Sequence, residues 1–132
     1  MVKRLLNKLE RSWGVKNMQG KELETTLFEI IAGVGSARSL YIEAIQAARG
    51  KDMDKANQLL KEGQDAFDKG HRFHADLMRD VSSDEHEQVL KSDAWVMLLM
   101  HAEDQLMSAE AFGILAEEFI SLYQIMLDKG VL

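Results

Sequence analysis

The sequence contains no cysteine and no proline. Without cysteine there can be no disulfide, no thiolate nucleophile and no cysteine-ligated zinc site. Without proline the chain lacks the residue that most strongly interrupts helices. No segment reaches the roughly 18 uncharged apolar residues of a membrane span, and the N-terminus lacks the long apolar run and small-residue cleavage site of a signal peptide. We therefore expect a cytoplasmic protein.

Composition and charge narrow the class further. The 132 residues carry a formal net charge of −6, and no basic face is concentrated enough to follow a phosphate backbone, so we expect no nucleic-acid binding. Leu, Ala, Glu, Lys, Met and Gln recur, and these residues favour helices over strands. The length suits one hydrophobic core. The sequence thus predicts an all-α fold.

The first twenty residues form a separate unit in the pattern. Apolar residues follow the spacing of one helical face, and basic residues lie between them; the apolar set is Val2, Leu5, Leu6, Leu9 and Trp13. Gly14 and residues 17–20 interrupt the pattern. We expect residues 1–20 to be a short amphipathic helical extension and residues 21–132 the main domain. Docking on that domain, contact with a partner and contact with an anionic membrane surface are the alternatives.

Three long helices are predicted in the main domain, over about 21–49, 53–81 and 93–129. Asp52 is the expected N-cap of the second, Ser92 of the third, and Gly50 the left-handed cap after the first. Gly33 and Gly35 in mid-helix are expected to let another backbone come close. The last helix is apolar nearly all round, which predicts that it is buried on more than one side and associates with further copies of the chain.

One group of polar residues interrupts the apolar pattern of this last helix. His101 is surrounded in sequence by apolar residues, and on a helix Asp104 and Gln105 share its face because residues three and four apart are neighbours. A polar group at such a place needs a function, a partner or a buried hydrogen bond. His74 of the second helix is expected to face the core, with His71 one turn before it at the edge of the apolar face.

These residues carry a resemblance to a known family. From about residue 23 to 128 the chain resembles the IIA component of the lactose/cellobiose (chitobiose) family of the bacterial phosphoenolpyruvate-dependent sugar phosphotransferase system. The matching signatures are Gly35-Ser36-Ala37-Arg38-Ser39 on the first long helix, His71 on the second, and His101-Ala102-Glu103-Asp104-Gln105-Leu106-Met107 on the third, which looks like the family's His-Ala-Gln-Asp-His-Leu-Met.

The resemblance implies both a fold and an activity. The fold would be an antiparallel three-helix bundle assembled into a homotrimer. His101 would be phosphorylated by the histidine-containing phosphocarrier protein and would pass the phosphoryl group to a cysteine of a IIB component, for uptake of lactose, cellobiose, chitobiose or a related β-glucoside through the membrane IIC component. Asp104 would bind a divalent metal, expected to be Mg²⁺, at the trimer axis. His71 would lie at the rim of the site.

The chain departs from the family pattern at three positions. His74 stands where the family usually has Gln, Gln105 stands where it has a second His, and Glu103 replaces a Gln. Because the first two residue types are exchanged, we expect His74 and Gln105 to meet across the helix interface and to belong to the site. Two other functions stay open from sequence: a non-catalytic helical interaction or regulatory module derived from this family, and a two-component histidine phosphotransfer domain.

Overall fold

The computed structural model describes residues 20–81 and 93–132, and nearly all of them belong to three α-helices. These are α2 (Gly20–Arg49), α3 (Met53–Val81) and α4 (Asp93–Asp128), and no strand occurs in the described part of the chain. The all-helical prediction is confirmed, with helix ends close to the expected positions. The predicted N-terminal helix and the Ser92 cap lie outside the described residues.

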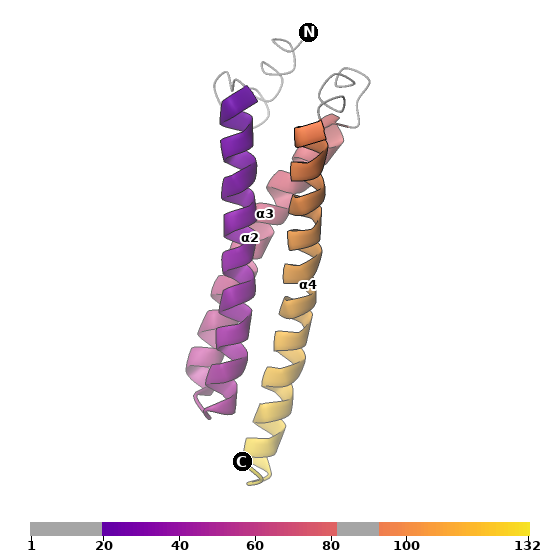
Figure 1. Ribbon diagram of the computed structural model, residues 1–132. Coiled ribbons are helices and arrows are strands. Elements are labelled where there is room, and N and C mark those ends of the chain that lie inside the picture. The colour runs from indigo at the N-terminus through magenta and orange to yellow at the C-terminus, as the bar shows by residue number, and fades with distance from the viewer. Residues whose placement is uncertain (1–19, 82–92) are drawn as a thin grey trace.

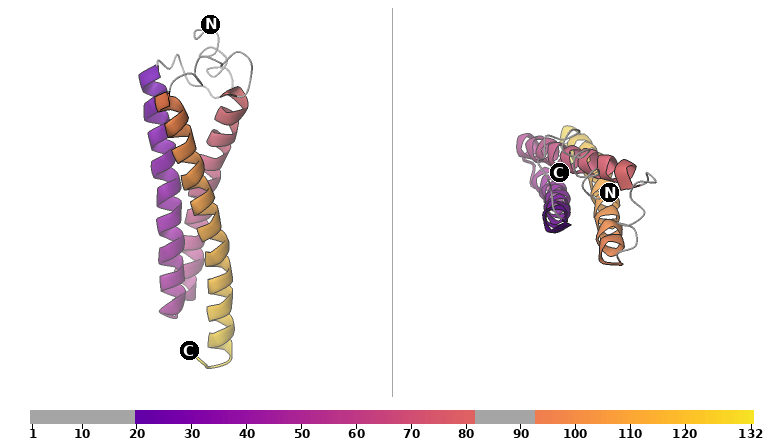
Figure 2. Two further views of the ribbon diagram at one scale, coloured as in Figure 1. Left: turned by 45° about the vertical axis from the view of Figure 1, so that its right-hand side comes forward. Right: turned by 90° about the horizontal axis from the view of Figure 1, so that it is seen from above.

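Consecutive helices run in opposite directions. α2 and α4 descend side by side from the upper end of the molecule, and α3 returns upward (Figure 1). Figure 2 shows that α3 is inclined to the other two helices, so that its upper end lies away from α2. The first residues of α2 and α4 and the last of α3 therefore lie at one end of the bundle.

The core is formed by one side of each helix and changes in character along the bundle. At the lower end it is built around the small residues Ala44, Ala48 and Ala56, whereas at the upper end it contains Leu27, Ile30, Val34, Leu77, Leu99 and Leu106. Small side chains let helices approach, and larger ones hold them apart. The larger core side chains at the upper end therefore agree with the divergence of α3 from α2 toward that end.

The close approaches between helices occur at other glycines than the sequence suggested. A Cβ atom placed on Gly33 or Gly35 would meet nothing within 4 Å, so none of the described helices makes the predicted close approach at these two residues. A Cβ on Gly63 would instead lie 2.7 Å from Cε1 of Tyr41, and one on Gly70 would lie 2.6 Å from Cγ2 of Val34. Both belong to α3, whose contact with α2 depends on the missing side chains.

The turn between α2 and α3 corrects a second detail. Lys51, with φ of 68°, takes the left-handed conformation that we predicted for Gly50. Asp52 caps α3 as predicted, because its Oδ1 accepts a hydrogen bond from the Lys55 amide at 3.1 Å. Gly130 has φ of 65° just past α4. None of the described helices is long and apolar enough to cross a membrane.

Candidate functional site

His101 lies in the upper third of α4 with its side chain exposed. Its imidazole makes no hydrogen bond or ion pair with any residue in the described ranges. Asp104, one turn further on, is also exposed, and Gln105 is half-buried. Ala102 and Leu106 point into the core on the other side of the helix. The helix therefore presents the imidazole to solvent on a rigid, well-packed support.

The side of α4 that carries His101 faces α2. Ser108 lies seven residues, or about two turns, after His101 and so shares its side of the helix. Its Oγ accepts a hydrogen bond from Nη1 of Arg38 in α2 at 3.3 Å. Within the described residues Arg38 has no carboxylate partner. A guanidinium thus lies along the same flank as the imidazole, two turns below it.

The other flank of α4 faces α3 and holds His74. This imidazole is buried, with 7% of the residue exposed, and its Nε2 lies 3.1 Å from Oε2 of Glu103. The two groups are not aligned for a hydrogen bond, and Nε2 has no other hydrogen-bond partner in the described part of the chain. The contact is therefore electrostatic. Burial lowers the pKa of His74, Glu103 opposes this by raising it, and His71 adds to the lowering.

The expected contact between His74 and Gln105 is replaced by this contact with Glu103. Residues on an α-helix are 100° apart, so Glu103 lies about 160° around α4 from His101, whereas Gln105 lies on the His101 side. His71 of α3 is exposed and packs its ring at 47° against Phe67, with 5.5 Å between the ring centroids. One chain thus keeps His71 and His74 on the α3 flank and His101 with Gln105 on the α2 flank.

Between the two flanks runs an exposed apolar stripe of α4. It consists of Met97, Met100, Met107, Ile114, Leu115, Leu122 and Ile125, each between 49% and 70% exposed. Asp104 lies within this stripe between Met100 and Met107, and Glu118 lies in its lower half. So large a contiguous apolar surface is typical of an interaction site rather than of a solvent-facing helix.

A metal site is incomplete in one chain. No group of three or more His, Cys, Asp or Glu side chains that could hold a metal ion occurs among the described residues. Asp104 supplies one oxygen ligand of the kind that Mg²⁺ prefers, and such sites normally use one or two carboxylates with water. The chemistry of Asp104 therefore fits Mg²⁺, with water or groups beyond the described residues of one chain as the further ligands.

Sequence reasoning identified His101 and Asp104 as polar residues of an otherwise apolar helix, but it did not predict their exposure or the contact of Glu103 with His74. Glu103 and His74 are both departures from the family pattern, one acidic and one basic when protonated. Their opposite charge types were a usable signal that they meet. The Arg38–Ser108 contact has no such signal, because neither residue departs from an expected pattern.

The chain is similar to known proteins in both sequence and structure. The model of the family described as "PTS system, Lactose/Cellobiose specific IIA subunit" matches residues 25–124. The lichenan-specific phosphotransferase enzyme IIA component of Bacillus subtilis is 31% identical over 83% of this chain and 94% of its own length. The lactose-specific EIIA component of Staphylococcus epidermidis is 30% identical over 81% of this chain and 97% of its own.

A solved structure is also similar. The crystal structure of the cellobiose-specific enzyme IIA from Bacillus anthracis superposes with a TM-score of 0.69 and 32% sequence identity. The match covers 86% of this chain and 96% of that one.

Proposed function

Because the chain belongs to the lactose/cellobiose-specific IIA family of the sugar phosphotransferase system, we propose that His101 is the residue that carries its phosphoryl group. As a member of this family the chain is a phosphotransferase component that relays a phosphoryl group during uptake of lactose- or cellobiose-type sugars. The observation that supports His101 is its exposure, with no hydrogen-bond or ion-pair partner among the described residues, on a helix whose neighbouring surface is apolar and exposed.

The chemistry requires an accessible neutral imidazole. A ring nitrogen of His101 would attack the phosphorus of a phosphohistidine on the histidine-containing phosphocarrier protein, forming one P–N bond as the other breaks. A cysteine thiolate of a IIB component would then take the phosphoryl group, with a P–S bond replacing the P–N bond. This chain has no cysteine, so the second acceptor belongs to another protein or domain.

The environment of His101 favours passing a phosphoryl group on over holding it stably. The residue lies in the middle of a helix, where backbone amides are already hydrogen-bonded and offer no anion cradle. The Asp104 carboxylate one turn away would repel the added negative charge. A phosphoryl group held without strong stabilisation is readily passed on.

Incubation with phosphoenolpyruvate and the general phosphotransfer proteins, followed by intact-mass measurement, tests the assignment. The parent chain should gain one acid-labile phosphoryl group, and His101→Ala should gain none. His86→Gln, which changes a histidine to which no role in the site is assigned, is the matched control and should still be labelled. A parent chain that takes up no phosphoryl group would favour the non-catalytic interaction module instead.

We also propose that the chain acts as a homotrimer built on the exposed apolar stripe of α4. In this trimer the stripe of each chain would be covered by the stripes of the other two chains. Asp104 would then approach the Asp104 residues of those chains at the threefold axis. Such an arrangement would bring the α2 flank of one α4, with His101 and Gln105, toward the α3 flank of a neighbour, with His71 and His74. Three carboxylates near an axis repel one another unless a cation or protons join them.

A divalent cation, which we propose to be Mg²⁺, would join the three Asp104 carboxylates. Asp104→Leu would then give a trimer whose stability no longer depends on Mg²⁺, whereas the parent should dissociate more readily after chelation. Light scattering at several protein concentrations, with Mg²⁺ or with a chelator, measures both. If chelation leaves the parent unchanged, Asp104 has another use.

We place the relay in the cytoplasm, where the proposed phosphoryl donor acts, with the membrane reached through IIC.

A further inference from the structure

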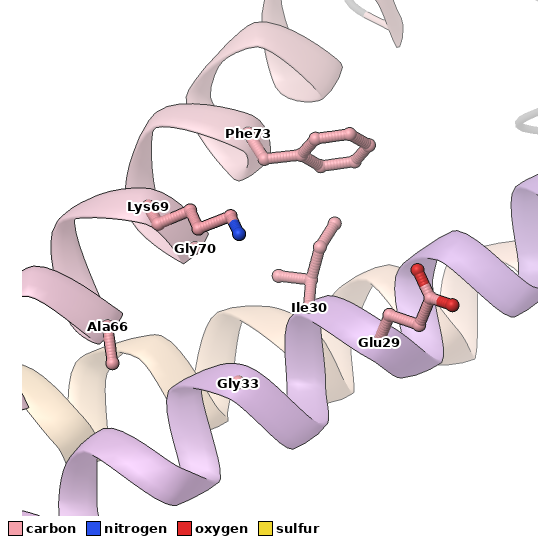
Figure 3. A pocket seen from close by; sticks show the side chains of 7 residues that line it. All are labelled: Glu29, Ile30, Gly33, Ala66, Lys69, Gly70 and Phe73. Carbon is pink, nitrogen blue, oxygen red and sulfur yellow. The ribbon is translucent and has the colours of Figure 1, made fainter. Parts of the chain in front are cut away.

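An apolar groove lies between α2 and α3, on the opposite side of this pair from α4. It has a volume of about 270 Å³ and is lined by Glu29, Ile30 and Gly33 of α2 and by Ala66, Lys69, Gly70 and Phe73 of α3. In Figure 3 the side chains of Ile30, Lys69 and Phe73 reach into the space between the two helices. Gly33 leaves the α2 wall open, because a Cβ there would meet no atom within 4 Å.

The lining of this groove defines what it can bind. Ile30, Ala66 and Phe73 offer apolar surface, whereas charge is confined to Glu29 on the α2 wall and Lys69 on the α3 wall. A groove with an apolar floor and one charge of each sign suits the apolar side of an amphipathic helix.

We propose that this groove is the docking site of the chain's own residues 2–13. These residues lie outside the described part of the structure, so the inference rests on the groove, on the sequence pattern and on the tether. The stretch places Val2, Leu5, Leu6, Leu9 and Trp13 on one helical face, as a groove-binding helix requires.

The tether is long enough. Residues 14–19 connect the stretch to Gly20, the first residue of α2, and six residues span up to about 20 Å. Ile30 lies ten residues along α2, or about 15 Å from Gly20. A helix of twelve residues is about 18 Å long, so it can fold back antiparallel to α2 and cover the whole groove. Such an intramolecular tether raises the effective concentration of the segment at the site.

Charge also favours this occupant. Residues 1–19 contain five basic residues and one acidic residue, whereas residues 20–132 contain eleven basic and twenty-one acidic residues. Around the helix, Glu10 and Lys8 fall on opposite sides of the apolar face. An antiparallel helix in the groove can therefore place Glu10 beside Lys69 of α3 and Lys8 beside Glu29 of α2.

Hydrogen exchange measured by mass spectrometry on the full chain tests the proposal. Amides of residues 2–13 should exchange roughly tenfold or more slowly than in the isolated peptide. Gly33→Leu fills the groove and should raise their exchange toward the peptide rate. Gly35→Leu is the matched control, since Gly35 is equally open but lies about 160° away around α2. In this variant the amides of residues 2–13 should exchange as slowly as in the parent. Equal protection in both variants, or none in the parent, would overturn the proposal.

A second measurement distinguishes the chain's own segment from that of another copy. The protein has no cysteine, so Leu9→Cys with Ala66→Cys introduces the two thiols of a clean oxidation experiment. The proposal predicts an internal disulfide with the mass of one chain under denaturing conditions, and no internal disulfide when Lys61→Cys replaces Ala66→Cys. Linked dimers formed by the first pair would contradict docking within one chain. Neither experiment depends on phosphoryl transfer, so the relay at His101 stands or falls separately.

Discussion

Two histidines on neighbouring helices illustrate how position decides what a side chain can do. His74 is buried against Glu103, and its pKa is lowered, so its imidazole is held neutral within the bundle. His101 has the same chemistry but is exposed and has no partner in the described structure. A nucleophile that must meet two partner proteins in succession needs the second environment.

The His74–Glu103 contact leads to a prediction about pH. Because the folded state favours neutral His74, its contribution to stability is complete above the ordinary pKa of 6.5 and is lost as the pH falls through the lowered folded pKa. Glu103→Gln removes the group that raises this pKa. We therefore expect the free energy of unfolding of Glu103→Gln to fall more steeply below pH 6.5 than that of the parent.

Urea denaturation at a series of pH values, at one protein concentration, measures this difference. His74→Gln is the control, and its unfolding free energy should depend on pH less than that of the parent. A Glu103→Gln variant that is less sensitive to acid than the parent would contradict the electrostatic account of the contact.

A second residue-scale prediction concerns the glycines. Gly63→Ala would bring a methyl group 2.7 Å from the buried Tyr41 ring and 3.4 Å from the carbonyl oxygen of Ala37. Overpacking costs about 1–3 kcal/mol, and the helix propensity gained is about 1 kcal/mol at most, so we expect a net loss of up to about 2 kcal/mol. Gly35→Ala, with open space around it, should instead gain about 0.5–1 kcal/mol. Urea denaturation of both variants at equal concentration compares them.

At the scale of the helices, hydrophobic spacing predicted most of the structure. On α2 the apolar residues spaced three or four apart from Leu27 to Ala48 are buried, because a helix in a bundle buries the side that carries its apolar residues. The close-packed glycines were not predictable from one helix, since the contact of Gly70 depends on where Val34 of another helix lies. The left-handed turn residue fell on Lys51 instead of Gly50, a one-residue shift that helix spacing does not resolve.

The exposed stripe of α4 gives the prediction at this scale. Met107 is 62% exposed in the single chain, so Met107→Lys should change the folding of the protomer by less than about 0.5 kcal/mol. In the proposed trimer it would place three positive charges in one apolar interface and should shift the protein toward monomer. Glu43→Lys, at an exposed position of α2 on the side opposite its buried residues, is the matched control. Light scattering at several concentrations gives the mass, and an unchanged oligomer would contradict the use of this stripe.

At the scale of the molecule, the sequence predicted the helical fold and the family, but only part of the arrangement of the candidate site. His101 and Asp104 could be identified because they are polar residues in an apolar helix. Their arrangement relative to His71 and His74 could not, because it depends on which sides of α4 face α2 and α3 in the bundle. The choice of Glu103 as the partner of His74 depends on the rotation of α4 against α3, which no single-helix pattern fixes.

The central claim is that His101 carries the phosphoryl group, and the sequence allows a direct measurement. Trypsin cleaves after Lys and Arg, so each of the four histidines falls in a different peptide: 70–72, 73–79, 80–91 and 92–129 for His71, His74, His86 and His101. The chain is phosphorylated from phosphoenolpyruvate through the general phosphotransfer proteins, digested under alkaline conditions and analysed by mass spectrometry. We predict the added phosphoryl mass on peptide 92–129, at His101. Its appearance on any of the other three peptides, with 92–129 unmodified, would contradict the account.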